Sequence, residues 1–196
     1  MIREATTADV EPAADTLTAA FADYAFTRHT IAADRHLERL REFQRIFLAE
    51  IGIPHGRVWV SEDLQAVAVW STPAGDAGTT LEALLPRLID LAGDRAEAYA
   101  SAEATMATHR PTTPVWFLGT VGVAPSAQGR GLGRAVLSPG LENAEVEGTR
   151  AFLETSDRRN VRLYASLGFA VDAEYVLPDD GPRTWAMSRE PQTPGR

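Results

Sequence analysis

A strand, a glycine-rich loop and a helix follow one another just past the middle of this 196-residue chain. The run "PVWFLGTVGV" is apolar on both of its alternating faces, which is typical of a strand buried in the centre of a sheet. The loop "QGRGLGR" follows Pro125, and a helical pattern then continues to about Glu147. Because the amides of a helix N-terminus attract anions, and glycines let a ligand approach the backbone, this arrangement predicts a phosphate-binding turn.

Two glycines interrupt the strand, and two arginines border the loop. A glycine inside a strand often marks a bulge or a close backbone approach, which we expect at Gly119 and Gly122. A P-loop would need a lysine, but all 19 basic residues are arginines, and a dinucleotide fingerprint would need a glycine where Arg134 stands. Two interpretations stay open: a pyrophosphate held by backbone amides with Arg130 and Arg134 at its rim, or a glycine-rich turn without a ligand.

The rest of the chain alternates strand-like and helix-like segments, which predicts an α/β fold built on one sheet. Thr6 or Thr7 should cap the first helix, in which Pro12 is tolerated near the first turn. The clearest helix ends at Gly52 and carries an apolar stripe formed by Leu37, Leu40, Phe43, Phe47, Leu48 and Ile51. Strands are expected at 1–5, 57–61, 66–71, 114–123, 150–156, 170–177 and 183–189, and helices at 9–24, 32–52, 79–93, 94–110, 132–147 and 158–168.

Composition bounds the domain count and excludes several kinds of chemistry. With 44% hydrophobic and 23% charged residues, the chain suits one domain over 1–190, followed by a flexible tail at 191–196. The absence of cysteine excludes disulfides, thiolate metal sites and a cysteine nucleophile. His29, His36, His55 and His109 lack the usual spacing of metal ligands, so no metal is expected.

Charge and the N-terminal sequence bear on partners and location. The formal net charge of −8 argues against nucleic acid or an anionic membrane as the main partner. No apolar run approaches the roughly 18 residues that span a bilayer, and the first residues lack the basic and apolar regions of a signal peptide. We therefore expect a cytoplasmic protein with no nucleic-acid or membrane partner, whose oligomeric state the sequence leaves open.

The loop and a second motif resemble those of a known family. The pattern V-x-V-x-P-x-x-Q-G-x-G-L-G at 121–133 closely resembles the acetyl-coenzyme A motif of the GNAT N-acetyltransferases, and "FLETSDRRNVRLYASLGF" resembles that family's second signature. The resemblance implies a GNAT fold, in which a single mixed, mostly antiparallel sheet is flanked by helices and two central strands splay to receive acetyl-CoA as co-substrate. The residues that it assigns to acetyl-CoA are Val121, Gly122, Val123, Gln128, Gly129, Arg130, Gly131, Leu132, Gly133, Arg134 and Asn160.

The same resemblance assigns two catalytic roles. Tyr164 falls at the family's position for the general acid, and a phenol with a pKa of about 10 keeps a proton for the leaving thiolate at neutral pH. Glu154 is the candidate general base, provided that burial raises its pKa. Without a cysteine, direct attack of the amine in a ternary complex is the natural mechanism. The alternatives are that Tyr164 packs its helix against the sheet, that Glu154 only binds the substrate ammonium or structures the site, and that Asn160 is a helix N-terminal or turn residue.

The acceptor is indicated by other parts of the chain. "AAFADYAFTRHT", "AVAVWSTP" and "HRPTTPVWFLGTVGV" resemble GNAT members that acetylate puromycin, which implies acetylation of the α-amine on its O-methyltyrosine part and a role in antibiotic resistance. Tyr24 and His29 are the candidate substrate contacts. The aromatics Phe21, Tyr24, Trp70 and Trp116 either stack on the substrate or, for at least two of the four, belong to the core. The alternatives are another small amine, a protein N-terminus, or an acetyl-CoA sensor without catalysis.

Overall fold

Seven strands form one mixed sheet in the structure, a computed structural model that describes residues 1–192. Their order is β1-β2-β3-β4-β5-β7-β6, and every neighbouring pair is antiparallel except β4 and β5. The strands are β1 (Ile2–Glu4), β2 (Gly56–Ser61), β3 (Ala66–Ser71), β4 (Trp116–Val123), β5 (Ala151–Thr155), β6 (Ala170–Val176) and β7 (Arg183–Arg189). The predicted single, mostly antiparallel sheet is confirmed, with the apolar run at its centre.

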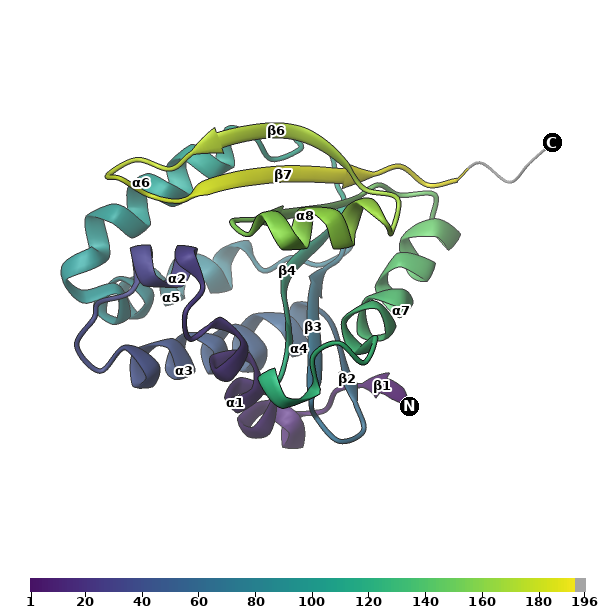
Figure 1. Cartoon of the computed structure of the whole chain (residues 1–196), viewed down its shortest axis with the longest axis horizontal. Coiled ribbons are helices and arrows are strands. Elements are labelled where there is room, and N and C mark those ends of the chain that lie inside the picture. Colours follow the sequence, from purple (N-terminus) through teal and green to yellow (C-terminus); the bar gives the residue numbers. More distant parts are fainter. Residues whose placement is uncertain (193–196) are drawn as a thin grey trace.

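Helical segments cover the sheet and fill the connections between its strands. The helices are α1 (Val10–Phe21), α2 (Ala25–Thr30), α3 (His36–Ile46), α4 (Ile53–His55), α5 (Gly78–Ala92), α6 (Ala96–Ala107), α7 (Leu132–Val146) and α8 (Arg158–Ala165). Three single 3₁₀ turns, η1 (Thr7–Asp9), η3 (Gly93–Arg95) and η4 (Pro125–Ala127), and one π-helical stretch, η2 (Phe47–Gly52), complete the set in residues 1–192. In Figure 1, β6 and β7 cross the view above α8, whereas β3 and β4 run almost at right angles to them.

The N-terminal segment is fixed by a capping arrangement around Asp9. Thr6 forms the N-cap of η1, and its backbone amide donates to Asp9 Oδ2 at 2.8 Å. The Arg3 guanidinium makes two hydrogen bonds to the Asp9 carboxylate, of 2.8 and 2.7 Å. These contacts hold the pKa of Asp9 well below its usual range, with the Arg3 hydrogen bonds as the main cause. Thr6 therefore caps the 3₁₀ turn η1, whereas the N-cap of the first helix, α1, is Asp9, and Pro12 lies near the start of α1.

The long helix at 32–52 differs from its prediction at both ends. It begins at His36 and does not end at Gly52, because helical backbone continues through η2 and α4 to His55. Gly52 has an ordinary helical φ of −63°, so it does not act as a left-handed terminator. A Cβ there would lie 2.8 Å from Val69 Cγ1, so this glycine serves close packing of the helix on β3. Leu37 of the predicted stripe is 53% exposed.

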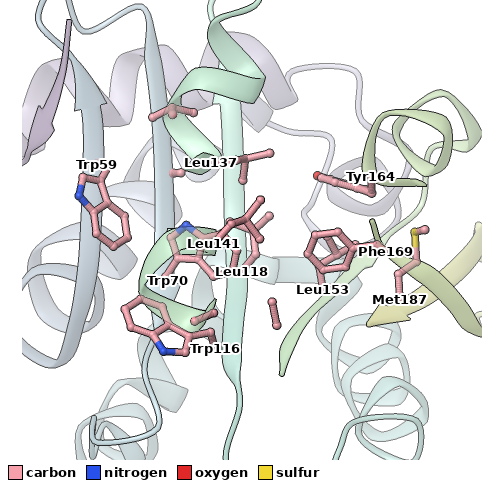
Figure 2. Close-up of a cluster of buried hydrophobic side chains, with 14 of the residues drawn as sticks. Trp59, Trp70, Trp116, Leu118, Leu137, Leu141, Leu153, Tyr164, Phe169 and Met187 are labelled. Carbon is pink, nitrogen blue, oxygen red and sulfur yellow. The ribbon is translucent and has the colours of Figure 1, made fainter. Parts of the chain in front are cut away.

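Two core layers lie on opposite faces of the sheet. One layer packs α1 and η2 against β2 and β3, and includes Leu17, Leu48, Val58 and Val67. The other packs α7 and α8 on the opposite face, and Figure 2 shows its tryptophans and leucines, with Tyr164 and Phe169 at one side. Trp70 and Trp116 are 0% and 2% exposed, so these two candidate stacking residues belong to the core.

None of the helices within residues 1–192 is long and apolar enough to cross a bilayer. Of the tail expected at 191–196, residues 193–196 lie outside the described part of the chain.

Candidate active site

The central strands β4 and β5 pair over a short distance and then diverge. Their parallel register covers only Trp116–Leu118 against Ala151–Leu153. Beyond Leu118, β4 stays paired with β3 up to Val123, whereas β5 stays paired with β7. The register between β3 and β4 shifts at Val69 and Trp70, where Gly119 is the extra residue. The bulge at Gly119 therefore coincides with the point of divergence, and the β5-facing edge of 119–123 has no strand partner among residues 1–192.

The glycine loop joins β4 to the N-terminus of α7. Gly129 and Gly131 have φ values of +76° and +79°, in the left-handed region that residues with a Cβ rarely adopt. Gly131 is the N-cap of α7, and Ala135 N donates to Gly131 O at 3.0 Å. The amides of 132–134 precede that first helical bond, so they are the donors that a helix N-terminus offers to an anion. Gln128 Nε2 donates to Val123 O at 3.2 Å and ties the loop to the strand.

A cavity of about 870 Å³ occupies the gap between the diverging strands. It is bounded by the corner between α1 and α2, by the free part of β4, by the glycine loop and by the start of α8. Its lining includes Ala19–Ala25, Val121, Gly122, Val123, Gln128, Gly129, Gly131, Leu132, Gly133, Arg134, Ser156, Asp157, Arg159, Asn160, Leu163 and Tyr164. Two segments that are far apart in the sequence, the first helices and the glycine loop, thus share one cavity.

Tyr164 stands between the core and the cavity. Its ring packs edge-on against Phe169, with ring centroids 5.9 Å apart, and the residue is 4% exposed. Figure 2 shows the side chain reaching from α8 toward β4, with its hydroxyl at the far end. Burial raises the pKa of this phenol above its ordinary value, so the hydroxyl keeps its proton at neutral pH.

Tyr24 lines the cavity from the corner between α1 and α2. Its hydroxyl accepts a hydrogen bond from Ser156 N at 2.5 Å and lies 3.2 Å from Thr155 Oγ1. Asn160 Nδ2 donates to the same Thr155 oxygen at 3.4 Å. Burial raises the pKa of Tyr24 as well. The chain just after β5 therefore links the α1–α2 corner to α8, and Phe21 packs edge-on against Tyr24 with centroids 5.1 Å apart.

Arg134 and Asp157 place charge at the cavity wall. Arg134 Nη2 donates to Ser166 Oγ at 2.9 Å, which links α7 to the end of α8. Asp157 is the N-cap of α8, and its carboxylate accepts from Arg159 N at 2.8 Å. The side chain of Arg159 holds the pKa of Asp157 below its ordinary value.

Glu154 belongs to a polar cluster on the other face of the sheet. Leu153 and Glu154 point to opposite faces because side chains alternate along a strand, and Leu153 belongs to the α7 side. Arg110 Nε donates to Glu154 Oε2 at 2.9 Å, and the Tyr175 hydroxyl donates to Oε1 at 3.2 Å. The Glu154 side chain is 4% exposed, and burial raises the pKa of its carboxyl while Arg110 opposes the shift.

Several residues singled out from the sequence lie outside the cavity lining. Arg130 is exposed and does not line the cavity, unlike the other residues assigned to acetyl-CoA. Glu154 comes directly after the last residue of β5 that pairs with β4, where the two strands diverge, but its side chain lies on the face of the sheet that α6 covers. His29 is 9% exposed in α2, and its Nε2 is 2.7 Å from where a Cβ on Gly181 would lie, so it packs under the turn between β6 and β7. Within residues 1–192, no group of three or more His, Cys, Asp or Glu could hold a metal ion.

The described geometry can be compared with that of known proteins. Residues 87–169 match the model of the Acetyltransferase (GNAT) family. A crystal structure from Corynebacterium glutamicum, described as histone acetyltransferase HPA2 and related acetyltransferase, aligns over 100% of this chain and 98% of its own, with 29% identity and a TM-score of 0.77. The chain has the GNAT fold.

A more distant structure shares this GNAT fold. The ribosomal-protein-S18-alanine N-acetyltransferase from Escherichia coli aligns over 100% of this chain and 96% of its own, with 17% identity and a TM-score of 0.57. At that identity, the likeness concerns the fold alone. The fold implied by the two sequence motifs is confirmed.

Curated proteins that are similar to part of this chain are acetyltransferases. The mycothiol acetyltransferase of Thermomonospora curvata is 44% identical over 71 residues, which are 33% of this chain and 24% of that protein. The mycothiol acetyltransferase of Nocardiopsis dassonvillei is 42% identical over 77 residues, which are 36% of this chain and 23% of that protein. The chain therefore spans about a quarter of the length of the curated relatives that it matches.

Sequence reasoning missed the groups that surround Glu154 and Tyr24 in this GNAT fold. Arg110 lies between α6 and β4 and Tyr175 lies on β6, so neither belongs to the two signature motifs. Ser156 lies within the second motif, but it contributes a backbone amide, which its residue type does not indicate. The "HRP" stretch that contains Arg110 resembles a known family but carries no signal of an ion pair with Glu154. Arg110 and Glu154 are 44 positions apart, and a single sequence contains no pattern that indicates contact over such a separation.

Proposed function

We propose that the protein is an acetyl-CoA-dependent N-acetyltransferase that acetylates a primary amine by direct attack in a ternary complex, with one domain over 1–190 carrying the activity. The observation that carries this proposal is the 870 Å³ cavity at the divergence of β4 and β5, lined by the glycine loop and by Tyr164. A concave site with a few convergent polar groups is the usual form of a ligand pocket. A cytoplasmic location, expected from the N-terminal sequence, stays a prediction.

The residues present fit acetyl-CoA, which when bound supplies the acetyl thioester. The unpaired edge of β4 at Val121 and Val123 would hold the amides of the pantetheine arm. The loop from Gln128 to Arg134 would hold the pyrophosphate, because its positive-φ glycines and helix-start amides form an anion cradle. Asn160 would contact the same ligand from α8.

Two side chains would manage the protons of the transfer. The acceptor ammonium loses a proton to Glu154, directly or through a water, and the neutral nitrogen then forms a bond to the acetyl carbon. As the bond from that carbon to sulfur breaks, the Tyr164 hydroxyl would give its proton to the sulfur. The nitrogen, which is positively charged after the attack, would lose its second proton to form the neutral amide, and that proton would restore the Tyr164 hydroxyl directly or through a water. The raised pKa of Tyr164 keeps the hydroxyl proton in place until the bond to sulfur breaks, and the raised pKa of Glu154 brings the base closer to neutral pH.

The acceptor proposed is the α-amine of puromycin or of a closely similar amine. This part of the proposal rests on the resemblance at 19–30 and on Tyr24, which lines the same cavity as Tyr164. His29, buried beside that corner, would act on the substrate only through the shape of α2. A mycothiol-type acceptor is the second candidate, because the curated relatives with 42% and 44% identity carry that name.

The test is release of coenzyme A from purified protein mixed with acetyl-CoA and puromycin. The chain has no cysteine, so the protein itself adds no signal when a thiol reagent reports the released coenzyme A. Release with puromycin above the no-acceptor rate supports the full proposal. Release only with other amines, among them a mycothiol-type acceptor, would replace the acceptor and keep the transfer. No release with any amine would refute the activity.

The role of Tyr164 is tested by Tyr164→Phe, which removes one oxygen from a buried ring. We expect kcat to fall by about 10²-fold or more, since a positioned acid contributes roughly 10² to 10⁴. The dissociation constant of acetyl-CoA should stay within about twofold, as calorimetric titration would show. An unchanged kcat would remove Tyr164 as the acid and leave it a packing residue.

A further inference from the structure

Arg110 connects two carboxylates on the α6 side of the sheet. Its Nε and Nη2 both lie 2.9 Å from Glu154 Oε2, and its Nη1 donates to Glu103 Oε2 at 3.1 Å. The guanidinium also lies over the Phe117 ring, 5.5 Å from its centroid. The Phe117 ring on its face and the carboxylates of Glu154 and Glu103 at its edges fix the orientation of the guanidinium. A lysine ammonium has no such planar group and could not make the same contacts.

The Glu154 carboxylate is almost fully occupied by these partners. A carboxylate offers about four lone-pair positions. The two Arg110 nitrogens face Oε2, and the Tyr175 hydroxyl faces Oε1 at 3.2 Å. One position on Oε1 is left by this count. The Tyr175 ring is itself fixed, because His109 stacks on it with ring centroids 4.0 Å apart and an interplanar angle of 14°.

We propose that Arg110 is the positioning residue of the acceptor side: it orients the Glu154 carboxylate so that the one free position on Oε1 receives the acceptor proton, and Glu103 anchors the guanidinium. This inference rests on the proposed function for the role of Glu154, but the arrangement itself can be tested without turnover. The three ionised groups Glu103, Arg110 and Glu154 sum to one negative charge, which suits a cationic acceptor.

The groups that face Glu154 act on its carboxyl in opposite directions. Arg110, from the segment before β4, lowers the pKa, and so does the Tyr175 hydroxyl from β6. Glu103, from α6, raises it as a like charge, and burial raises it most. Removing the cation should therefore make Glu154 harder to ionise, whereas removing the Glu103 charge should make it easier.

The experiment is a pH titration of carbon-13-labelled glutamate side chains by NMR, in the whole chain. The Glu154 signal is assigned by its absence in Glu154→Gln. We expect Arg110→Met to raise the Glu154 midpoint by about one pH unit or more, since a close opposite charge shifts a carboxyl by about 1–3 units. Glu103→Gln should lower the midpoint. If Arg110→Met fails to fold, the Glu154 midpoint in Glu103→Gln still tests the arrangement, because a midpoint that does not fall would overturn it.

Arg87→Met is the matched control, because Arg87 also bridges two glutamates, Glu42 and Glu50, on the outside of α5. It should leave the Glu154 midpoint in place. The kcat/KM profile should follow the NMR shifts, so that kcat/KM of Arg110→Met falls relative to the wild type by about tenfold for each pH unit between the new midpoint and the wild-type midpoint. Arg110→Lys, which keeps the charge, should hold the midpoint within a few tenths of a unit but raise the acceptor KM.

Midpoints that do not move in either variant, or that move in the same direction, would overturn the inference. So would a loss of kcat/KM in Arg110→Met that is equal at every pH, which is what a structural role alone would give. Because the NMR titration needs no acetyl transfer, failure of the proposed function would be seen separately, as absent coenzyme A release in the wild type.

Discussion

The glycines at positions 131 and 133 should respond in opposite ways to the same substitution. Gly131 has a φ of +79°, and a Cβ there would meet no atom within 4 Å, so alanine costs backbone strain only. Left-handed backbone costs a residue with a Cβ about 1–2 kcal/mol, and the smaller entropy of the unfolded alanine chain returns about 0.4–1 kcal/mol. Gly131→Ala should therefore lower the free energy of unfolding by about 1 kcal/mol, or about 2–4 °C in Tm for a chain of this size.

Gly133 has no positive φ, and a Cβ there would lie 3.7 Å from Val123 Cγ2, an ordinary contact. Because alanine favours helix over glycine by up to about 1 kcal/mol, Gly133→Ala should keep or raise Tm. Gly133 nevertheless lines the cavity at the start of α7, where the proposed pyrophosphate would approach the backbone. We expect the added methyl to weaken coenzyme A binding about tenfold, or about 1.4 kcal/mol.

Thermal unfolding without ligand and calorimetric titration with coenzyme A separate the two effects. The expected pattern is a stability loss confined to Gly131→Ala and, for Gly133→Ala, weaker binding without a stability loss. Wild-type affinity in Gly133→Ala would refute close backbone approach as the reason for that glycine. An equal stability loss in both variants would refute the conformational argument for Gly131.

Two further predictions concern stability. Gly140→Ala should lower the free energy of unfolding by about 2–3 kcal/mol, measured by urea denaturation, because its Cβ would lie 2.4 Å from Cε2 of the fully buried Trp70; wild-type stability would mean that α7 shifts freely on β3. Asp9→Asn should lower the free energy of unfolding by about 2 kcal/mol at neutral pH, where the carboxylate binds Arg3 and accepts a hydrogen bond from the Thr6 amide. Since the pKa of Asp9 is lowered on folding, this difference should shrink as the pH falls below about 4, and a difference that is constant with pH would contradict the assignment.

The parts of the site that lie in continuous stretches could be predicted from the sequence. The strand, loop and helix at 116–146 are local, and the glycines that need positive φ are recognisable by their spacing. Tyr164 follows in a second local motif. The bulge was expected at a strand glycine and lies at Gly119. The local sequence therefore predicted the part of the cavity wall that β4, the glycine loop and the start of α7 form.

The contacts between distant segments could not be predicted. Ser156 N reaches the Tyr24 hydroxyl across 132 positions, and Arg110 reaches Glu154 across 44, with no spacing that would indicate either pair. The end of the long helix was wrong for a related reason. Gly52 has the residue type of a helix end, but its role is set by Val58 and Val69 of the sheet packed against it, and local rules do not include those neighbours.

The short pairing between β4 and β5 makes the sheet an interrupted ladder. In the described part of the chain, three residue pairs between Trp116–Leu118 and Ala151–Leu153 connect the half that contains β1–β4 with the half that contains β5–β7. A ligand bound along the open edge at 119–123 would supply hydrogen bonds to β4 where β5 does not pair with it. Under the proposed function, acetyl-CoA is thus part of the hydrogen-bonded sheet as well as a reactant. Each turnover then breaks and re-forms the hydrogen bonds that join the co-substrate to β4.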